Sequence, residues 1–257
     1  MENDLSNKLK NFTPISLTQM NSTASFLDRI EKKYLISKKQ LELVLKELEK
    51  DFYVLEINDK SVFTYDNVYM DTKNHDFYKL HQEGKKSRTK IRTRLYVDSN
   101  ISFFEYKQKQ DKTIRKFRYE FPSEEHGTMT KGKTRFYEGV YMSFYGKLPE
   151  KITPSLNTNY NRLTLCAKDN GERVTVDFNI KTKNLRDPKA KKTSLENAVI
   201  LESKSMSEDC LSHRVMKKLG IETASSCSKY CLGLIYSGIE GGKGKFKKTI
   251  KQIKEMK

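Results

Sequence analysis

The chain has 257 residues, of which 36% are hydrophobic and 11% aromatic, so it can bury the core of one large domain or of two small ones. Fifty Lys and Arg residues against 33 Asp and Glu residues give a formal charge of +17, which favours a polyanionic partner: nucleic acid, an anionic membrane surface or another form of phosphate. No run approaches the roughly 18 apolar residues of a membrane-spanning helix, and the N-terminus lacks the apolar core of a signal peptide.

The cysteines do not have the spacing of a zinc site. Cys227 and Cys231 form the one close pair, and this C-x3-C has neither a second pair nor a nearby His, which argues against zinc. Reduced thiols in the cytoplasm fit this pattern best.

The first third of the chain predicts an arm, a strand, a helix and a second strand. Residues 1–24 are polar and rich in Asn, Ser and Thr, so we expect a flexible arm. Residues 26–36 are typical of a strand, and residues 37–52 have the apolar spacing of an amphipathic helix, with Ser37 as its N-cap. A second strand is predicted at 62–72.

Three strands with charges at alternate positions are predicted between residues 90 and 121. Lys90, Arg92 and Arg94 share one parity in the first strand, and Glu105, Lys107 and Lys109 do so in the second. In the third, Lys116 and Arg118 alternate with aromatic residues. Because side chains alternate across a strand, each strand presents one charged and one apolar face.

The rest of the chain continues the pattern. A helix with an aromatic stripe is predicted at 134–146, strands at 156–168, 173–183 and 197–205, and a helix at 207–219 with Ser207 as its cap. Residues 241–257 form a Lys-rich tail. The helices interrupt about eight strands without alternating with them, which indicates an α+β fold with an antiparallel sheet and not a parallel βαβ sheet.

The charged rows have two interpretations. The simpler is an antiparallel sheet with its charged face in water. The alternative is a closed eight-stranded antiparallel barrel whose charged rows point into the lumen, with the helices packed outside. Repeated Glu-x-Lys pairs, at Glu31–Lys33, Glu105–Lys107 and Glu202–Lys204, favour the tunnel, because the acidic residues would neutralise buried cations.

The residue types in these rows suit phosphate. Arg binds phosphate oxygens through a planar fork, and Lys adds a point charge. Carboxylates without His or Cys suit Mg²⁺ or Mn²⁺, which bind through a few carboxylates together with substrate phosphates. The pattern therefore indicates a linear phosphate chain with a divalent metal, and phosphoryl transfer as its chemistry. Neither a nucleotide-binding glycine loop nor a common hydrolase motif is present.

Eight blocks in order resemble the vacuolar transporter chaperone (VTC) domain, a family of the CYTH or triphosphate tunnel metalloenzyme superfamily. They are RIEKKYLI, YDNVYMDT, KIRTRLY, FFEYKQK, IRKFRYEF, YNRLTLCAKDNGERVTVDFNI, VILESKS and SKYCLGL. The resemblance covers residues 26–238 and implies a tunnel domain over about residues 25–240. It also implies synthesis of inorganic polyphosphate from the γ-phosphate of ATP, with Mn²⁺ or Mg²⁺.

Site residues follow from the resemblance and from the charged rows. Catalytic roles fall on Arg92, Arg94, Lys107, Lys116, Arg173, Lys204 and Lys229. Substrate-binding roles fall on Lys33, Lys109, Arg118 and Arg162. The metal ligands are Glu202 first, then Glu31, Glu105 and Asp177.

Two alternatives to the polymerase stay open: a triphosphatase or polyphosphatase, and a non-catalytic binder of polyphosphate or nucleic acid. The related hydrolases often carry Glu-x-Glu-x-Lys, whereas Arg29 makes the block here R-x-E-x-K, which favours the polymerase. Nucleic acid as the main partner is disfavoured because most Tyr and Phe occupy the row opposite the cations. The eukaryotic polymerases also carry an inositol-phosphate-sensing domain and a transmembrane segment; we find neither, so coupling to a membrane would require a partner protein.

Overall fold

The computed structural model describes residues 2–23, 30–111, 113–169, 171–195, 197–224, 226–239 and 244–256. The predicted strand at 26–36 corresponds to β2, Ile30–Ser37, and Arg29 lies outside the described residues.

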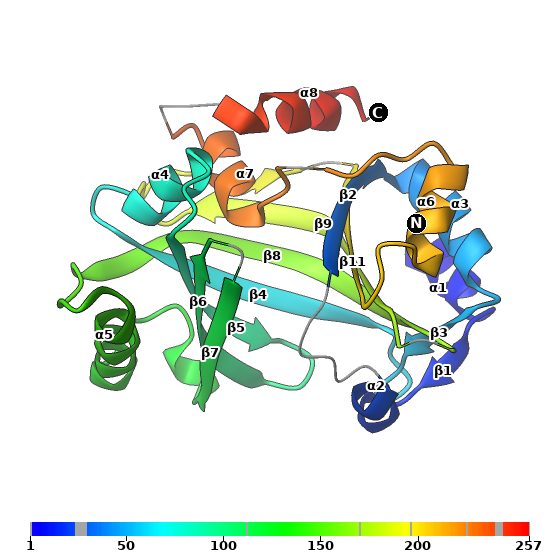
Figure 1. Ribbon diagram of the computed structural model, residues 1–257, viewed down its shortest axis with the longest axis horizontal. Coiled ribbons are helices and arrows are strands. Elements are labelled where there is room, and N and C mark those ends of the chain that lie inside the picture. The colour runs from blue at the N-terminus through cyan, green and yellow to red at the C-terminus, as the bar shows by residue number, and fades with distance from the viewer. Residues whose placement is uncertain are drawn as a thin grey trace.

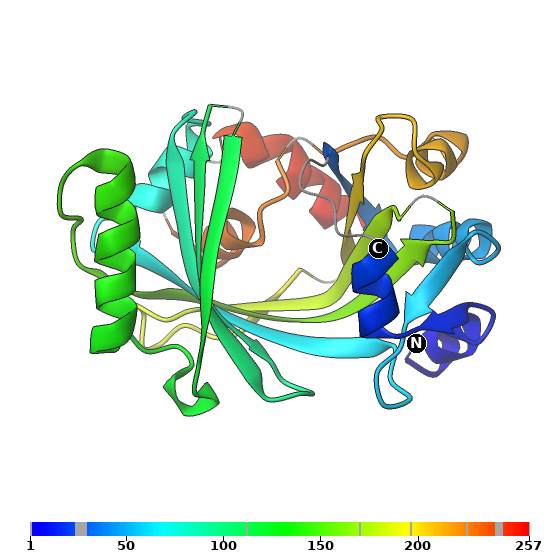
Figure 2. The ribbon, with the colours of Figure 1, turned by 60° about the horizontal axis from the view of Figure 1, so that its bottom comes forward.

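One antiparallel sheet forms the centre of the molecule (Figure 1). In the part described, its main path has eight strands, in the spatial order β2 (Ile30–Ser37), β11 (Ala198–Ser205), β9 (Arg173–Asn184), β8 (Ile152–Ala167), β4 (Val62–Thr72), β5 (Arg88–Tyr96), β6 (Ile101–Gln110) and β7 (Thr113–Phe121). Figure 2 shows β5–β7 turned away from the long strands β4 and β8, on the side opposite β2 and β11. Among the described residues β2 pairs only with β11 and β7 only with β6, so hydrogen bonds do not close the sheet and the predicted closed barrel is not confirmed.

Three short strands extend this sheet. β1 (Thr13–Ile15) pairs in parallel with β3 (Phe52–Leu55), which pairs with β8, and β10 (Thr193–Ser194) pairs with β9.

The helices lie on both faces of the sheet or across its ends. They are α1 (Glu2–Leu9), α2 (Leu17–Thr23), α3 (Lys38–Leu48), α4 (Asp76–Gln82), α5 (Lys131–Tyr145), α6 (Leu211–Lys218), α7 (Lys229–Tyr236) and α8 (Lys247–Glu255), with 3₁₀ turns η1 (Ser123–Glu125) and η2 (Gly244–Phe246). No helix in the described ranges is both long and apolar enough to cross a bilayer.

Two of the predicted helix starts can be compared with the structure. Ser37 caps α3 as expected: its hydroxyl accepts from the backbone N–H of Gln40, and the Gln40 side chain accepts from the N–H of Ser37. This reciprocal pair satisfies two donors that a helix start leaves without intrahelical partners. The predicted cap at Ser207 is wrong, because α6 begins at Leu211 after Cys210.

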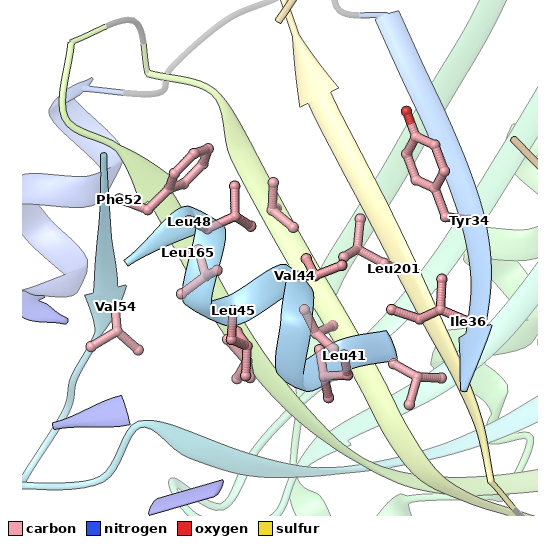
Figure 3. Close-up of a cluster of buried hydrophobic side chains, with 14 of the residues drawn as sticks. Tyr34, Ile36, Leu41, Val44, Leu45, Leu48, Phe52, Val54, Leu165 and Leu201 are labelled. Atoms are coloured by element: carbon pink, nitrogen blue, oxygen red, sulfur yellow. The ribbon is translucent and has the colours of Figure 1, made fainter. Parts of the chain in front are cut away.

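The apolar rows of the strands form the outer face, and helices cover it as predicted. In Figure 3, Leu41, Val44 and Leu45 of α3 pack on the sheet, where they meet Ile36 of β2 and Leu201 of β11. A second outer cluster lies under α5, where Tyr137 packs with apolar residues of β4–β7. The outer faces of both halves are thus dry, so the charged rows point to the other side of the sheet.

The N-terminal segment is not the flexible arm that its composition predicts. Leu9 and Phe12 belong to the buried cluster under α3, and Ile15 and Met20 pack in another with Cys166. A few apolar anchors at wide spacing suffice to hold a segment of low mean hydropathy.

The C-terminal segment, predicted only as a Lys-rich tail, is also packed against the rest of the protein. Phe246, Ile250 and Ile253 are buried in a cluster with α7 and residues of β2, β8 and β11. Figure 1 shows α8 lying across the sheet beside α7. The Lys side chains of α8 face solvent while its apolar side is buried, an amphipathic arrangement that a Lys-rich composition obscures.

Gly233 of α7 leaves no room for a side chain. A Cβ there would stand 2.6 Å from Leu156 Cδ2 and 3.0 Å from Thr182 Cγ2, both in well-packed strands. We expect Gly233→Ala to lower the free energy of unfolding by about 1–3 kcal/mol, because overpacking forces strands and helix apart.

Urea unfolding of Gly233→Ala and Gly139→Ala tests this packing. Gly139 of α5 has no atom within 4 Å of its would-be Cβ, so its substitution should be neutral or stabilising by up to about 1 kcal/mol. Equal stabilities of the two variants would contradict the close approach of α7 to the sheet.

Candidate active site: a basic cavity on the inner face of the sheet

A cavity of about 400 Å³ lies on the charged face of the sheet. Twelve Lys or Arg and three Glu side chains line it, from β2, β11, β8 and β5–β7, together with α7 and η2. The period-two alternation of the strands places these charges together, since every second residue faces the cavity. The cationic row therefore lines a partly open cavity and not a flat wet surface.

Most of the residues predicted from the sequence line this cavity. They are Glu31, Lys33, Arg92, Arg94, Glu105, Lys107, Lys109, Lys116, Arg162, Glu202, Lys204 and Lys229. Asp177 lies directly behind the wall, in contact with Arg162 and Lys229. Arg173 and Arg118 are not among the lining residues: Arg173 lies next to Lys204 in the sheet, and the exposed Arg118 stacks on the Phe103 ring at 4.6 Å.

Glu105 organises the first cation cluster. Its side chain is 3% exposed; its Oε2 lies 2.6 Å from Arg92 and 3.9 Å from Arg94 Nε, and its Oε1 lies 2.7 Å from Lys116 Nζ. Burial opposes ionisation of Glu105, but these three cations hold its pKa well below the usual value. Arg94 also donates to Asn67 Oδ1 at 3.0 Å, which fixes its orientation.

Asp177 organises the second cluster. The Arg162 guanidinium donates to it twice, at 2.5 and 2.8 Å, and Lys229 at the start of α7 makes an ion pair with the same carboxylate. Burial opposes ionisation, but Arg162 and Lys229 lower the pKa of Asp177 to about 2. α7 is in turn held by Tyr230, whose hydroxyl donates to the buried carboxylate of Asp71.

Glu202 organises the third cluster, between β2 and β11. Its carboxylate contacts Lys33 and lies 2.8 Å from Lys204 Nζ, which is 3.8 Å from Glu31. Burial opposes ionisation, but Lys33 and Lys204 hold the pKa of Glu202 well below its usual value. The E-x-K motifs of two neighbouring strands are thus crossed, each Glu facing the Lys of the other strand.

The cavity also contains residues outside the predicted catalytic, substrate-binding and metal-ligating sets. Lys90 lies 5.4 Å from the Tyr69 ring centroid and 3.5 Å from Ser228 Oγ, and burial lowers its pKa to about 8. Arg88 and Lys90 have the same parity in β5 as Arg92 and Arg94, so the alternation of that strand could have predicted that both residues line the cavity. Tyr69, His81 and Lys245 come from other elements, and only the tertiary fold brings them here.

Aromatic side chains are not confined to the outer row. Tyr65 stacks on Tyr160 with ring centroids 5.5 Å apart, and the Arg162 guanidinium lies 4.8 Å from the Tyr65 ring. Arg94 lies 5.3 Å from the same ring. The aromatic rings on the inner face thus support Arg side chains, an exception to the expected separation of the two rows.

The donor set fits a hard cation only in part. The described residues contain no group of three carboxylate, His or Cys side chains close enough to enclose a metal ion. Glu31 and Glu202 both lie near Lys204 Nζ, at 3.8 and 2.8 Å, so they are close enough together to serve as the one or two carboxylates that ordinarily hold Mg²⁺ with substrate phosphates. Glu105 and Asp177 are enclosed by cations, a setting that suits charge neutralisation better than metal ligation.

Two solved structures are similar to this chain. A candidate adenylyl cyclase from Hippeastrum with a dominant triphosphatase activity is similar with a TM-score of 0.50 and 13% identity, over 83% of this chain and 98% of that one. A candidate adenylate cyclase from Bacillus halodurans gives a TM-score of 0.46 and 14% identity, over 78% of this chain and 94% of that one. At such identities the likeness concerns the fold.

The sequence match identifies the family of the chain. The VTC domain model matches residues 28–237, so the chain belongs to the VTC domain family, and the resemblance predicted from the sequence is confirmed. Comparison with curated proteins gives no match.

Proposed function

We propose that the protein is a metal-dependent polyphosphate polymerase that transfers the γ-phosphate of ATP to a growing inorganic polyphosphate chain in the basic cavity. The observation that carries this proposal is the excess of cations over carboxylates on the inner face, in a chain of the VTC domain family. A cavity with this charge favours a ligand of many negative charges. Because all four cysteines are buried free thiols, we also place the protein in the reducing cytoplasm.

In this proposal the side chains have three roles: they bind phosphate, orient the phosphate-binding cations, or hold the metal ion. Arg92, Arg94 and Lys116 bind phosphate oxygens, and Glu105 keeps them oriented and limits their mutual repulsion. Lys204 and Lys33 are positioned at the metal pair Glu31 and Glu202. A bound Mg²⁺ or Mn²⁺ would neutralise charge on the transferred phosphoryl group.

A second group of basic residues in the cavity binds the rest of the phosphate chain. We assign Lys107, Lys109, Arg162 and Lys229 to it, with Arg162 and Lys229 held in place by Asp177. Arg173 and Arg118 would act from the margin of the cavity, on phosphates outside its centre. Phosphoryl transfer depends on alignment and charge neutralisation, which fixed cations supply without a protein nucleophile.

Incubation with ATP and Mn²⁺, followed by gel separation of the products, tests this function. The proposal predicts long polyphosphate chains. Orthophosphate alone would overturn the polymerase and favour a triphosphatase, and no turnover combined with polyphosphate binding would favour a non-catalytic binder.

The pKa of Lys90 predicts how binding depends on pH. Bound phosphate stabilises the protonated amine, so affinity falls as the pH rises through about 8, where the free amine loses its proton. Burial opposes ionisation of the adjacent Tyr69, but Arg92 and Lys90 lower its pKa to about 8, and its negative charge would weaken binding over the same range. We expect roughly tenfold weaker tripolyphosphate binding at pH 9.5 than at pH 7.

Lys90→Arg is the matched control for this pH effect, because a guanidinium stays protonated throughout the range. Calorimetric titrations of both proteins should show a smaller fall for the variant than for wild type, while Tyr69 and Lys116, whose pKa values are also about 8, titrate in both proteins. The ligand titrates identically in both experiments, so equal pH profiles would contradict the role of Lys90.

A further inference from the structure

The cations of β5 and β6 continue beyond the Glu105 cluster in matched pairs. Lys90 lies opposite Lys107, and Arg88 lies opposite Lys109 one step further along. A step of two residues along a strand is about 7 Å. The row therefore extends well past Arg92, toward the end of the sheet that α4 and η2 cover.

η2 adds a third cation at that end. Lys245 lines the cavity, with its Nζ 3.7 Å from the point where a Cβ on Gly84 would stand, and the next residue, Phe246, is fully buried and anchors the turn. Burial lowers the pKa of Lys245, and so do the nearby charges of Arg88 and Lys109. Lys245 lies outside residues 28–237, the part of the chain that the family model matches.

These cations differ from the rest of the cavity in their lack of acidic partners. Arg88, Lys109 and Lys245, which we call the outer basic cluster, make no ion pair with any carboxylate of the described residues; the same is true of Lys90 and Lys107. By contrast, Glu105, Asp177 and Glu202 each hold two or more cations. Cations that repel one another without an internal counter-charge require an anion from outside.

We propose that the outer basic cluster is a subsite for the distal phosphates of a linear polyphosphate chain longer than a triphosphate. It lies two steps beyond Arg92 along β5, so a short ligand held by the Glu105 cluster does not reach it. Arg88 and Lys109 are half-buried and Lys245 is exposed, so the chain can continue from here into solvent.

The surroundings favour an inorganic chain over a nucleic acid. Binding of single strands relies on exposed aromatic rings on which bases stack. The aromatic residue beside the outer basic cluster is Phe246, which is fully buried, and Tyr69 further inside is 1% exposed. Charge without a stacking surface matches a phosphate chain that carries no bases.

The inference rests on the proposed function. Comparing a short and a long phosphate ligand distinguishes failure of the subsite from failure of the proposed function. We would titrate tripolyphosphate and a linear chain of about 15 phosphates into wild type, Lys245→Gln and Arg88→Gln. Loss of one charge-assisted contact should weaken long-chain binding by about tenfold. Tripolyphosphate binding should change by less than about twofold in both variants.

Lys248→Gln is the control, because the Lys248 side chain is 88% exposed on α8 and pairs with Glu222 outside the cavity. It should leave both affinities unchanged. Equal weakening of both ligands by Lys245→Gln and Arg88→Gln, or no weakening of the long chain, would overturn the subsite. A wild type that binds neither ligand would overturn the proposed function itself.

Discussion

Glu105→Gln should lower the free energy of unfolding by about 3–5 kcal/mol, the range observed when one partner of a buried ion pair is removed. The carboxylate is 3% exposed and faces Arg92, Arg94 and Lys116. An amide of the same size keeps the packing but leaves these cations to repel one another without compensation. The effect is therefore electrostatic and separable from any change of shape.

Tripolyphosphate should restore part of the lost stability of Glu105→Gln, because a ligand that binds only the folded state shifts the unfolding equilibrium. Chemical denaturation with and without the ligand measures both effects. Glu83→Gln is the control, since Glu83 forms an exposed pair with Lys85 and its loss should change stability by less than about 0.5 kcal/mol. A Glu105→Gln protein as stable as wild type would contradict the neutralising role of this residue.

Glu202→Gln should reduce turnover with ATP and Mn²⁺ by about 100-fold or more, because the loss of a metal ligand removes several kcal/mol of charge stabilisation in the transition state. Binding of tripolyphosphate without metal should be retained or strengthened, since Lys33 and Lys204 lose their acidic partner. The opposite directions of the two effects distinguish a metal ligand from a phosphate-binding residue.

Electron paramagnetic resonance of Mn²⁺ provides a readout apart from turnover. In the presence of tripolyphosphate, Glu202→Gln should bind Mn²⁺ more weakly than wild type. Glu222→Gln is the matched control, because its side chain is 86% exposed and pairs with the surface residue Lys248. Unchanged turnover and unchanged Mn²⁺ binding in Glu202→Gln would remove this residue from the metal site.

The alternation of charge in the sequence predicted which side chains share a face. The predicted strand at 62–72 is β4, and Arg92, Arg94 and Lys107 line one cavity as expected. This part is predictable because the face of a strand residue depends only on period two. Closure is a different property: alternation does not say which edges meet, and β2 and β7 remain unpaired with each other in the structure described.

Residues that join the cavity from outside the sheet were harder to predict. α7 was not predicted as a helix, because its five residues from Tyr230 to Leu234 are all buried and show no amphipathic period. Lys245 reaches the cavity through the packing of η2 against α4, a contact between segments far apart in sequence. Such contributions depend on tertiary packing, for which a single sequence carries no periodic signal.

Calorimetric titration of tripolyphosphate into wild type and Lys90→Gln tests most directly whether the inner cavity binds linear phosphates. Lys90 makes no ion pair with a described carboxylate, so its neutralisation leaves the Glu105, Asp177 and Glu202 clusters intact. We predict tight binding by wild type and about tenfold weaker binding by the variant, with Lys248→Gln unchanged. Equal affinities of wild type and Lys90→Gln, or no binding by either, would contradict the assignment of this cavity to linear phosphates.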